Sequence, residues 1–132
     1  MVGSNDIARS KKFYDALFVA MGGKPGFVAM GGKPGVEDAK GRLIYAHNGG
    51  RFMVCKPIDG KPATHANGGT IGFSLSDPKQ ADAWHKAGVA NGGTTIEDPP
   101  GVRQGASGEL YLAYLRDPDG NKLCALHRLP AA

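Results

Sequence analysis

The sequence has few cysteines and no long apolar run, and each scarcity excludes a class of protein. Only 2 of the 132 residues are cysteine, and Cys55 and Cys124 stand without a Cys-x-x-Cys pair or a histidine-rich neighbour. This spacing indicates neither a zinc site nor a disulfide framework, so two buried free thiols are expected. No stretch approaches the roughly 18 apolar residues of a membrane helix, and no signal peptide is recognisable. We therefore expect a cytoplasmic protein with no membrane partner.

Positive charge is present but is nowhere concentrated. The net charge is +4 with a pI near 9.2, yet the densest basic run is only Arg9-Ser10-Lys11-Lys12. Without a basic stripe or a nucleic-acid motif, no nucleic-acid partner is expected. Glycine is abundant, with 21 residues, and predicts frequent turns. A chain of this length suits one compact domain or two small modules that share a core.

The first half predicts a helix followed by a hairpin. Asn5 and Asp6 are good N-caps, and apolar residues recur at helical spacing after them, so a helix is expected over residues 7–20. Residues 41–47 and 51–57 flank Asn48-Gly49-Gly50, which is a hairpin signal.

An exact nine-residue repeat interrupts this half. FVAMGGKPG at residues 18–26 is followed at once by FVAMGGKPG at residues 27–35. So perfect a copy indicates a recent slippage event, an engineered insertion or a feature added to the chain. We interpret it as a loop insertion, since added surface-loop length costs little entropy. Either copy can end the helix, and the altered hinge also permits a segment to exchange between chains.

The second half predicts a strand, a helix and a closing hairpin. Residues 58–69 are rich in turn formers and read as a connector, and residues 70–76 alternate as a half-buried strand does. Asp77 and Pro78 start a second helix that ends near residues 92–93. We then expect a short strand at 94–99 and a glycine-rich loop at 99–108.

The closing hairpin, residues 110–128, is the strongest signal in the chain. Its turn is Asp117-Pro118-Asp119-Gly120-Asn121. Pairing Arg116 with Lys122 places Tyr114 opposite Cys124, with all four side chains on one face of the sheet. That face is either the lining of a groove or an ordinary solvent-exposed sheet face.

The two halves resemble each other at a spacing of about 70 residues, each reading as a strand, a helix and three strands. We divide the chain into a first module at 1–57, which contains the duplicated nonapeptide, a connector at 58–69 and a second module at 70–132. By the same spacing, the first strand is expected to begin just before Met1.

Paired βαβββ modules, a helix entered through SNDIARSKKFYDAL, a TIGFSLSD strand and a closing RDPDGNKLCAL hairpin resemble the vicinal oxygen chelate superfamily. That group includes glyoxalase I, fosfomycin- and bleomycin-resistance proteins and extradiol dioxygenases. The resemblance implies an α+β fold in which two modules form a curved, mostly antiparallel sheet with a concave groove. It also implies, in the enzymes, a divalent metal held by side chains from four strands.

The family's metal ligands do not carry over to this sequence. The resemblance places Cys124 where the last strand has a glutamate, Thr70 where the fifth strand has a histidine, and a residue near Val54 at the third position. The fourth position would precede Met1. We therefore expect no metal and no other cofactor, unless unexpected residues act as ligands.

The other candidate residues are expected around the groove. His47 precedes a turn and His65 lies in the connector, so either can reach over it, whereas His85 and His127 read as surface or packing residues. The resemblance favours a groove-facing Tyr114, which offers a donor and an acceptor. Arg116 can bind an anion or pair with a nearby aspartate. Cys124 as a nucleophile would need a neighbouring base, and no histidine is placed to act as one.

These features predict a glyoxalase- and bleomycin-resistance-like module that binds a small molecule, with Tyr114, Arg116, Cys124, Thr70, His47 and His65 around its groove. The positive charge argues against a cationic drug such as bleomycin and favours a neutral or anionic ligand. One alternative is a metal-dependent lyase or transferase resembling glyoxalase I. Another is an engineered or rearranged variant without activity. A homodimer is expected, with a segment-swapped form as a variant of it.

Overall fold

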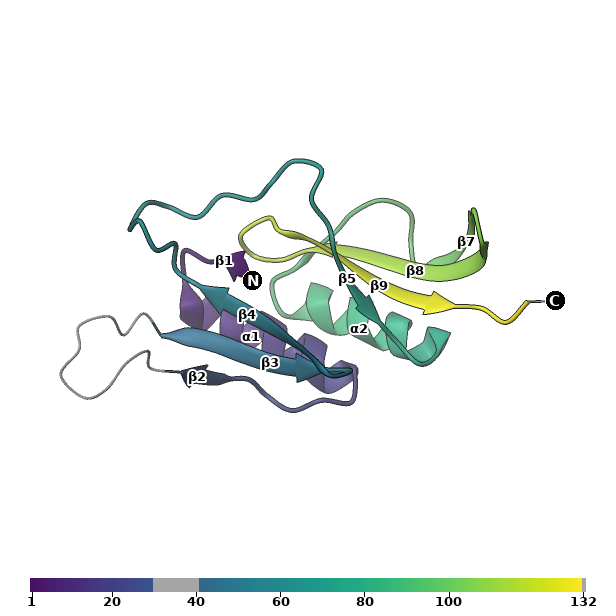
Figure 1. Cartoon of the computed structure of the whole chain (residues 1–132), viewed down its shortest axis with the longest axis horizontal. Coiled ribbons are helices and arrows are strands. Elements are labelled where there is room, and N and C mark those ends of the chain that lie inside the picture. Colours follow the sequence, from purple (N-terminus) through teal and green to yellow (C-terminus); the bar gives the residue numbers. More distant parts are fainter. Residues whose placement is uncertain (30–40, 132) are drawn as a thin grey trace.

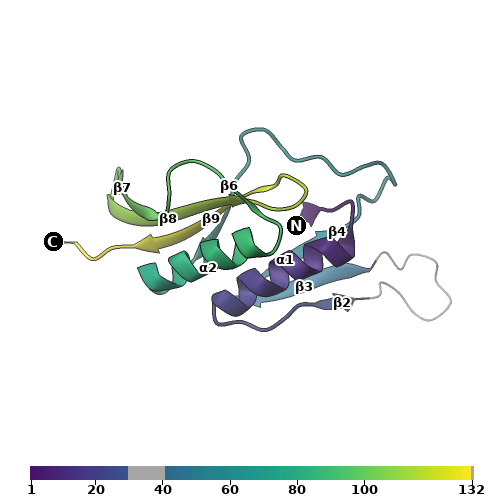
Figure 2. The ribbon, with the colours of Figure 1, turned by 180° about the vertical axis from the view of Figure 1, so that it is seen from behind.

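The computed structural model describes residues 1–29 and 41–131 of the chain. Two helices lie side by side against the same side of two sheets, as the front and rear views show (Figures 1 and 2). The first sheet has the order β1-β4-β3-β2, and the second has the order β5-β9-β8-β6 with β7 also paired to β8. The elements are β1 Val2–Gly3, α1 Ile7–Ala20, β2 Phe27–Ala29, β3 Arg42–His47, β4 Gly50–Cys55, β5 Ile71–Ser74, α2 Pro78–Ala90, β6 Thr94–Thr95, β7 Gly101–Gly105, β8 Gly108–Arg116 and β9 Lys122–Arg128.

Both helices start where the sequence predicts. The Asp6 carboxylate accepts from the Arg9 N–H and the Asp77 carboxylate accepts from the Gln80 N–H, which satisfies amides that a helix leaves unpaired. The first copy of the nonapeptide ends α1. Gly22 has a φ of +83°, and the Gly23 N–H returns to the Phe18 carbonyl at 2.8 Å, which closes the helix.

The second copy of the nonapeptide begins as a strand. Residues 27–29 form β2, which pairs antiparallel with β3 in the register Phe27↔Ile44. The predicted loop insertion is therefore wrong at residues 27–29, and its remainder, residues 30–35, lies outside the described residues.

Both predicted hairpins form, and the register predicted for the closing hairpin is confirmed. In the closing hairpin Tyr114 lies opposite Cys124 and Arg116 opposite Lys122. In the first half, β3 and β4 are joined through Asn48 and Gly49, both with positive φ, which is typical of a tight two-residue turn.

The prediction of a glycine-rich loop at 99–108 is wrong in its central part. Residues 101–105 form β7, which pairs antiparallel with β8 from Gly101↔Leu112 to Gly105↔Gly108. Its sequence, Gly-Val-Arg-Gln-Gly, has a single apolar side chain, so a pattern based on apolar side chains does not detect the strand. Among the described residues, the second half therefore has one strand more than the first.

One core joins the two halves. Side chains from α1, α2 and both sheets form a single buried cluster, and an aromatic group made of Tyr14, Phe18, Phe52 and Phe73 lies within it. On α2 the buried residues are Ala81, Trp84 and Gly88. A Cβ on Gly88 would lie 2.3 Å from the Leu115 Cδ1 atom, so the close approach requires glycine here.

The two halves contact each other within one chain, through the turn of each hairpin. The His47 ring and the Asn48 amide both bind the Ser74 carbonyl at the end of β5, at 2.7 and 3.0 Å. Asp119, in the turn of the closing hairpin, contacts the first half: it accepts from the Asn5 N–H and from Arg9, both at 2.9 Å. Each turn thus holds the strand-to-helix junction of the other half.

Candidate functional site

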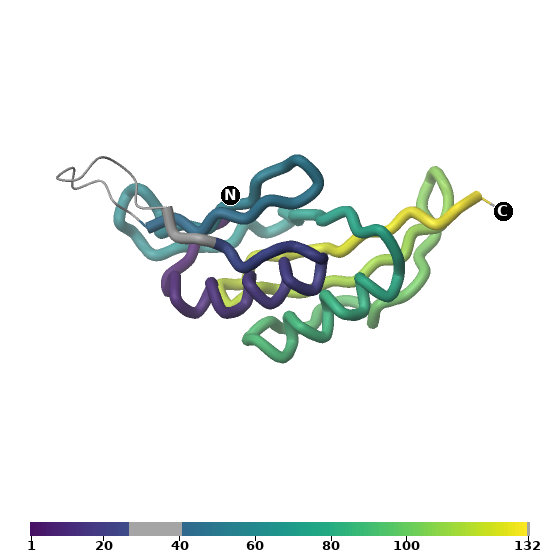
Figure 3. Tube along the Cα trace, turned by 90° about the horizontal axis from the view of Figure 1, so that it is seen from below, coloured from purple at the N-terminus to yellow at the C-terminus, as the bar shows by residue number. Residues whose placement is uncertain are grey.

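The predicted polar face of the closing hairpin points away from the helices. Leu115 and Leu123 are fully buried in the core, and side chains alternate along a strand, so Tyr114 and Cys124 take the other face. Seen from below, the helices run along one side of the molecule and these strands lie above them (Figure 3).

Tyr114 and Cys124 interact across this face. Burial raises the pKa of Tyr114, and the neighbouring Cys124 and Glu97 raise it further. Burial also raises the pKa of Cys124, although the Tyr114 hydrogen bond and Lys122 act in the opposite direction. The thiol is therefore protonated near neutral pH, which makes it a weak nucleophile and a poor metal ligand.

Lys122 begins β9, beside the polar face that carries Tyr114 and Cys124 and close to where the two halves of the chain meet. Its ammonium group is 5.0 Å from the centroid of the Tyr114 ring, within the range of a cation–π contact. The same group pairs with the Glu97 carboxylate at 2.8 Å. Glu97 comes from the loop between β6 and β7 and has a φ of +58°, a left-handed conformation that few residues other than glycine adopt.

A cavity of about 340 Å³ opens where the two halves meet, and we call it the junction cavity. It is bounded by β1, by the residues that lead into β5, by the start of β9 and by the connector. Its lining residues are Met1, Val2, Gly3, Thr64, Ala66, Gly69, Thr70, Ile71, Asn121 and Lys122. Two predicted features, Thr70 and the hairpin face through Lys122, therefore meet at one cavity.

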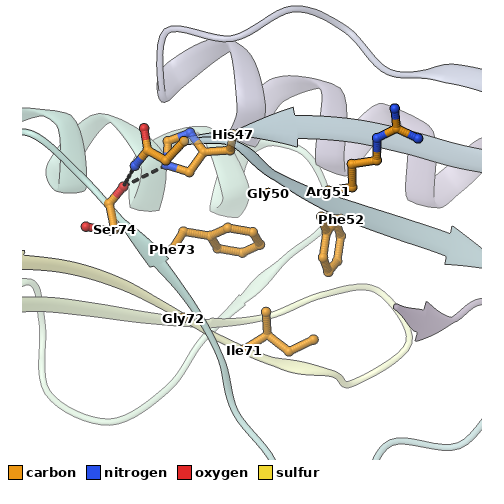
Figure 4. A pocket seen from close by; sticks show the side chains of 9 residues that line it. His47, Gly50, Arg51, Phe52, Ile71, Gly72, Phe73 and Ser74 are labelled. Carbon is orange, nitrogen blue, oxygen red and sulfur yellow. Dashed lines mark hydrogen bonds between the residues drawn. The ribbon is translucent and has the colours of Figure 1, made fainter.

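A second cavity, of about 260 Å³, lies between β4 and β5 (Figure 4). Phe52, Ile71 and Phe73 point into the space between these strands, while Arg51 extends away from it. His47 lines this cavity but already bonds to the Ser74 carbonyl at 2.7 Å, so this imidazole is engaged in holding the two halves together.

The remaining candidates lie elsewhere. Arg116 donates to the Gly120 carbonyl at 2.7 Å and so stabilises its own turn. The His65 ring lies against Gly120, where an added Cβ would approach its Nδ1 atom to 2.6 Å. His85 contacts the Thr95 hydroxyl at 3.0 Å, and His127 contacts the Leu75 carbonyl at 3.0 Å. None of these four residues lines the junction cavity.

Comparison with known proteins agrees with this architecture. The family model of the Glyoxalase/Bleomycin resistance protein/Dioxygenase superfamily matches residues 1–125. The chain belongs to this superfamily. A glyoxalase/bleomycin resistance protein from Albidiferax ferrireducens T118 is similar to it, with 55% identity, a TM-score of 0.86 and coverage of 97% of this chain and 95% of that one.

More distant glyoxalase-superfamily structures share the fold alone. A glyoxalase/bleomycin resistance protein/dioxygenase family enzyme from Burkholderia phytofirmans PsJN has 14% identity and a TM-score of 0.65, with 97% and 94% coverage. A lactoylglutathione lyase from Agrobacterium tumefaciens has 17% identity and a TM-score of 0.57, with 96% and 88% coverage. No curated protein matched the chain. Neither described helix is long and apolar enough to span a membrane.

At the positions that the resemblance assigns to metal ligands, the described side chains offer one hydroxyl and one thiol, from Thr70 and Cys124. Val54 is fully buried in the core, and the register turns its neighbour Met53 to the open face instead. Thr70 has only a hydroxyl to offer, and the Cys124 thiol is held protonated by burial. Within residues 1–29 and 41–131, no three His, Cys, Asp or Glu side chains are grouped so that they could hold a metal ion.

Sequence reasoning missed Glu97 and the contribution of β1 to the site. Glu97 reaches Lys122 because its backbone is left-handed, and nothing in the local sequence signals that conformation. Met1 and Val2 line the junction cavity because β1 pairs in parallel with β4, in the register Val2↔Val54. The internal repeat predicted that strand but not its place beside Thr70.

Proposed function

We propose that this glyoxalase-superfamily protein is a binding module that takes a small neutral or anionic organic molecule into the junction cavity without a catalytic metal. The supporting observation is Lys122, which lines the cavity and also lies over the Tyr114 ring. The Lys122 side chain is only 25% exposed, so an anion that meets it is screened less by water than an anion at the surface.

The groups around the cavity suit recognition better than reaction. Lys122 supplies up to three N–H donors, while Thr64 and Thr70, which also line the cavity, each supply a hydroxyl that donates or accepts. Asn121 is already committed, since its amide donates to the Gly3 carbonyl at 3.2 Å and to Asp117 at 2.8 Å. The cavity thus offers one cation and neutral hydroxyls, a set that fits an oxygen-rich or carboxylate-bearing ligand.

Replacing Lys122 tests the proposal directly. We expect Lys122→Met to weaken binding of carboxylate ligands by roughly tenfold, the effect of losing one charge-assisted hydrogen bond. Ligands are sought by thermal shift in a panel that pairs each carboxylic acid with its neutral amide and with a cationic amine. Lys86→Met, on an exposed position of α2, is the matched control and should leave binding unchanged. Equal losses in both variants, or a preference for cations, would contradict the proposal.

Metal content is the second measurement. After equilibration with nickel, manganese, iron and zinc, we expect far less than one equivalent of any metal per chain by mass spectrometry. Near-stoichiometric metal would reject the binding-module proposal and support a lyase or transferase resembling glyoxalase I. The search for ligands would then begin with His47 and His65.

We further propose that the protein acts in the cytoplasm as a homodimer. β2 and β6 stand at the outer ends of the two sheets, and an unpaired strand edge is a surface that a second copy can cover. Light scattering on the purified protein is expected to give twice the chain mass of 13.7 kDa. A monomer mass at micromolar concentration would contradict the dimer.

A further inference from the structure

Lys122 forms an ion pair with Glu97, and this pair bears on how a ligand binds. The inference rests on the proposed function, in which Lys122 binds the ligand. Lys122 has three described neighbours that bear on binding: the junction cavity, the Tyr114 ring at 5.0 Å and the Glu97 carboxylate at 2.8 Å. Any anion that reaches Lys122 from the cavity must share the ammonium group with Glu97 or displace it. The protein thus places one of its own carboxylates on the cation that we assign to the ligand.

We propose that the Glu97 carboxylate competes with the ligand for Lys122, and that the ligand is a small carboxylic acid that displaces Glu97 from Lys122. The geometry already places a carboxylate on Lys122 at ion-pair distance. A ligand carboxylate that enters from the cavity takes the same partner and adds the Thr70 hydroxyl on the cavity wall. Glu97 therefore lowers the apparent affinity of the cavity for anions, because each anion must first displace it from Lys122.

The exposure of the two side chains favours this exchange. Glu97 is 48% exposed, whereas Lys122 is only 25% exposed. A half-exposed carboxylate returns to water at little cost, and ion pairs of this kind are weak. The left-handed backbone of Glu97, at a φ of +58°, is a strained conformation for a side chain of this type. Release from Lys122 frees the side chain from the one ion pair that the described structure gives it.

The loop that carries Glu97 does not depend on the ion pair. The Arg103 guanidinium donates to the Asp98 and Pro99 carbonyls, at 3.1 and 2.8 Å, and β6 on the other side is paired with β8. Both flanks of the loop therefore stay anchored when the Glu97 side chain moves. Exchange of the carboxylate needs only a side-chain rotation, not an opening of the fold.

Glu97→Gln tests the competitor role, with sodium benzoate as the probe and benzamide as its neutral partner, titrated at low ionic strength and followed by NMR. We expect Glu97→Gln to bind benzoate about two- to fivefold more tightly than the unaltered protein, the effect of removing one exposed ion pair. Benzamide affinity should not change. Glu109→Gln removes the same charge from an exposed residue whose described partner is Gln104, and it should leave both affinities unchanged.

The outcomes separate this inference from the proposed function. If the unaltered protein binds benzoate and Glu97→Gln binds it no more tightly, or more weakly, the competitor role is rejected and the site assignment stands. If no variant binds benzoate and Lys122→Met matches the unaltered protein in every titration, the site assignment fails and the inference fails with it. Glu97→Gly, which removes both the carboxylate and the backbone strain, should match Glu97→Gln in affinity and unfold at the same temperature or higher.

Discussion

Gly88→Val is expected to destabilise the protein by about 3 kcal/mol, and to lower the unfolding temperature by roughly 10 °C. Even a Cβ at this position would lie 2.3 Å from Leu115 Cδ1 and 3.1 Å from Leu17 Cδ2. A β-branched side chain adds two methyl groups to this crowding, so α2 must shift away from both β8, which carries Leu115, and α1, which carries Leu17. Thermal and urea unfolding measure the loss.

The matched control lies on the same helix. Ala83 is exposed, so Ala83→Val carries only the lower helix propensity of valine, about 0.5 kcal/mol. If both variants lost the same stability, helix propensity would explain the result and the close crossing of the helices would not.

Asp117→Ala is expected to cost about 3 kcal/mol, because it leaves several buried donors without an acceptor. The carboxylate is 3% exposed and accepts the Tyr14 hydroxyl at 2.5 Å and the Asn121 side-chain amide at 2.8 Å. It also accepts the backbone N–H groups of Asp119 and Asn121, both at 2.9 Å. The group thus holds its own turn and ties it to α1 of the other half.

A double-mutant cycle separates these two roles. Burial raises the pKa of Tyr14 well above its usual value, and the Asp117 charge raises it further, so the phenol remains a donor over the working pH range. Tyr14→Phe and Asp117→Asn are expected to show a coupling energy of about 1–2 kcal/mol in urea unfolding. Additive losses would mean that the two side chains do not stabilise the fold as a pair.

Local sequence signals were enough for the helix starts, for both hairpins and for the register of the closing one. Asp6 and Asp77 act as N-caps in the structure as they do in the sequence pattern. The turn residues at 117–121 set the register that places Tyr114 opposite Cys124. These features depend on residues that are close in the chain, so they can be predicted from the sequence alone. β7 was not predicted, because glycine-rich strands lack the alternation of apolar side chains by which strands are recognised in a sequence.

The candidate site was predictable only in part. The shared face of Tyr114, Lys122 and Cys124 follows from alternation in a hairpin. The junction cavity depends on how β1, β5 and the connector pack, and the Lys122–Glu97 pair depends on a left-handed residue in a loop. Both arise from contacts between residues far apart in the sequence. His47 and His65 were also not predictable in their places: His47 bonds to the Ser74 carbonyl, and the His65 ring packs against Gly120, both far away in the sequence.

The repeated nonapeptide shows most directly what tertiary structure decided. The first Phe-Val-Ala lies in α1, where Phe18 is almost fully buried in the core and the following glycines close the helix. The same three residues form β2 in the second copy. At the end of the first copy, the Gly26 N–H donates to the Asp15 carboxylate at 2.9 Å, which holds the chain beside the edge of β3. Identical local propensities thus give a helix in one place and a strand in the other, because helix propensity is a weak preference that a neighbouring strand edge outweighs.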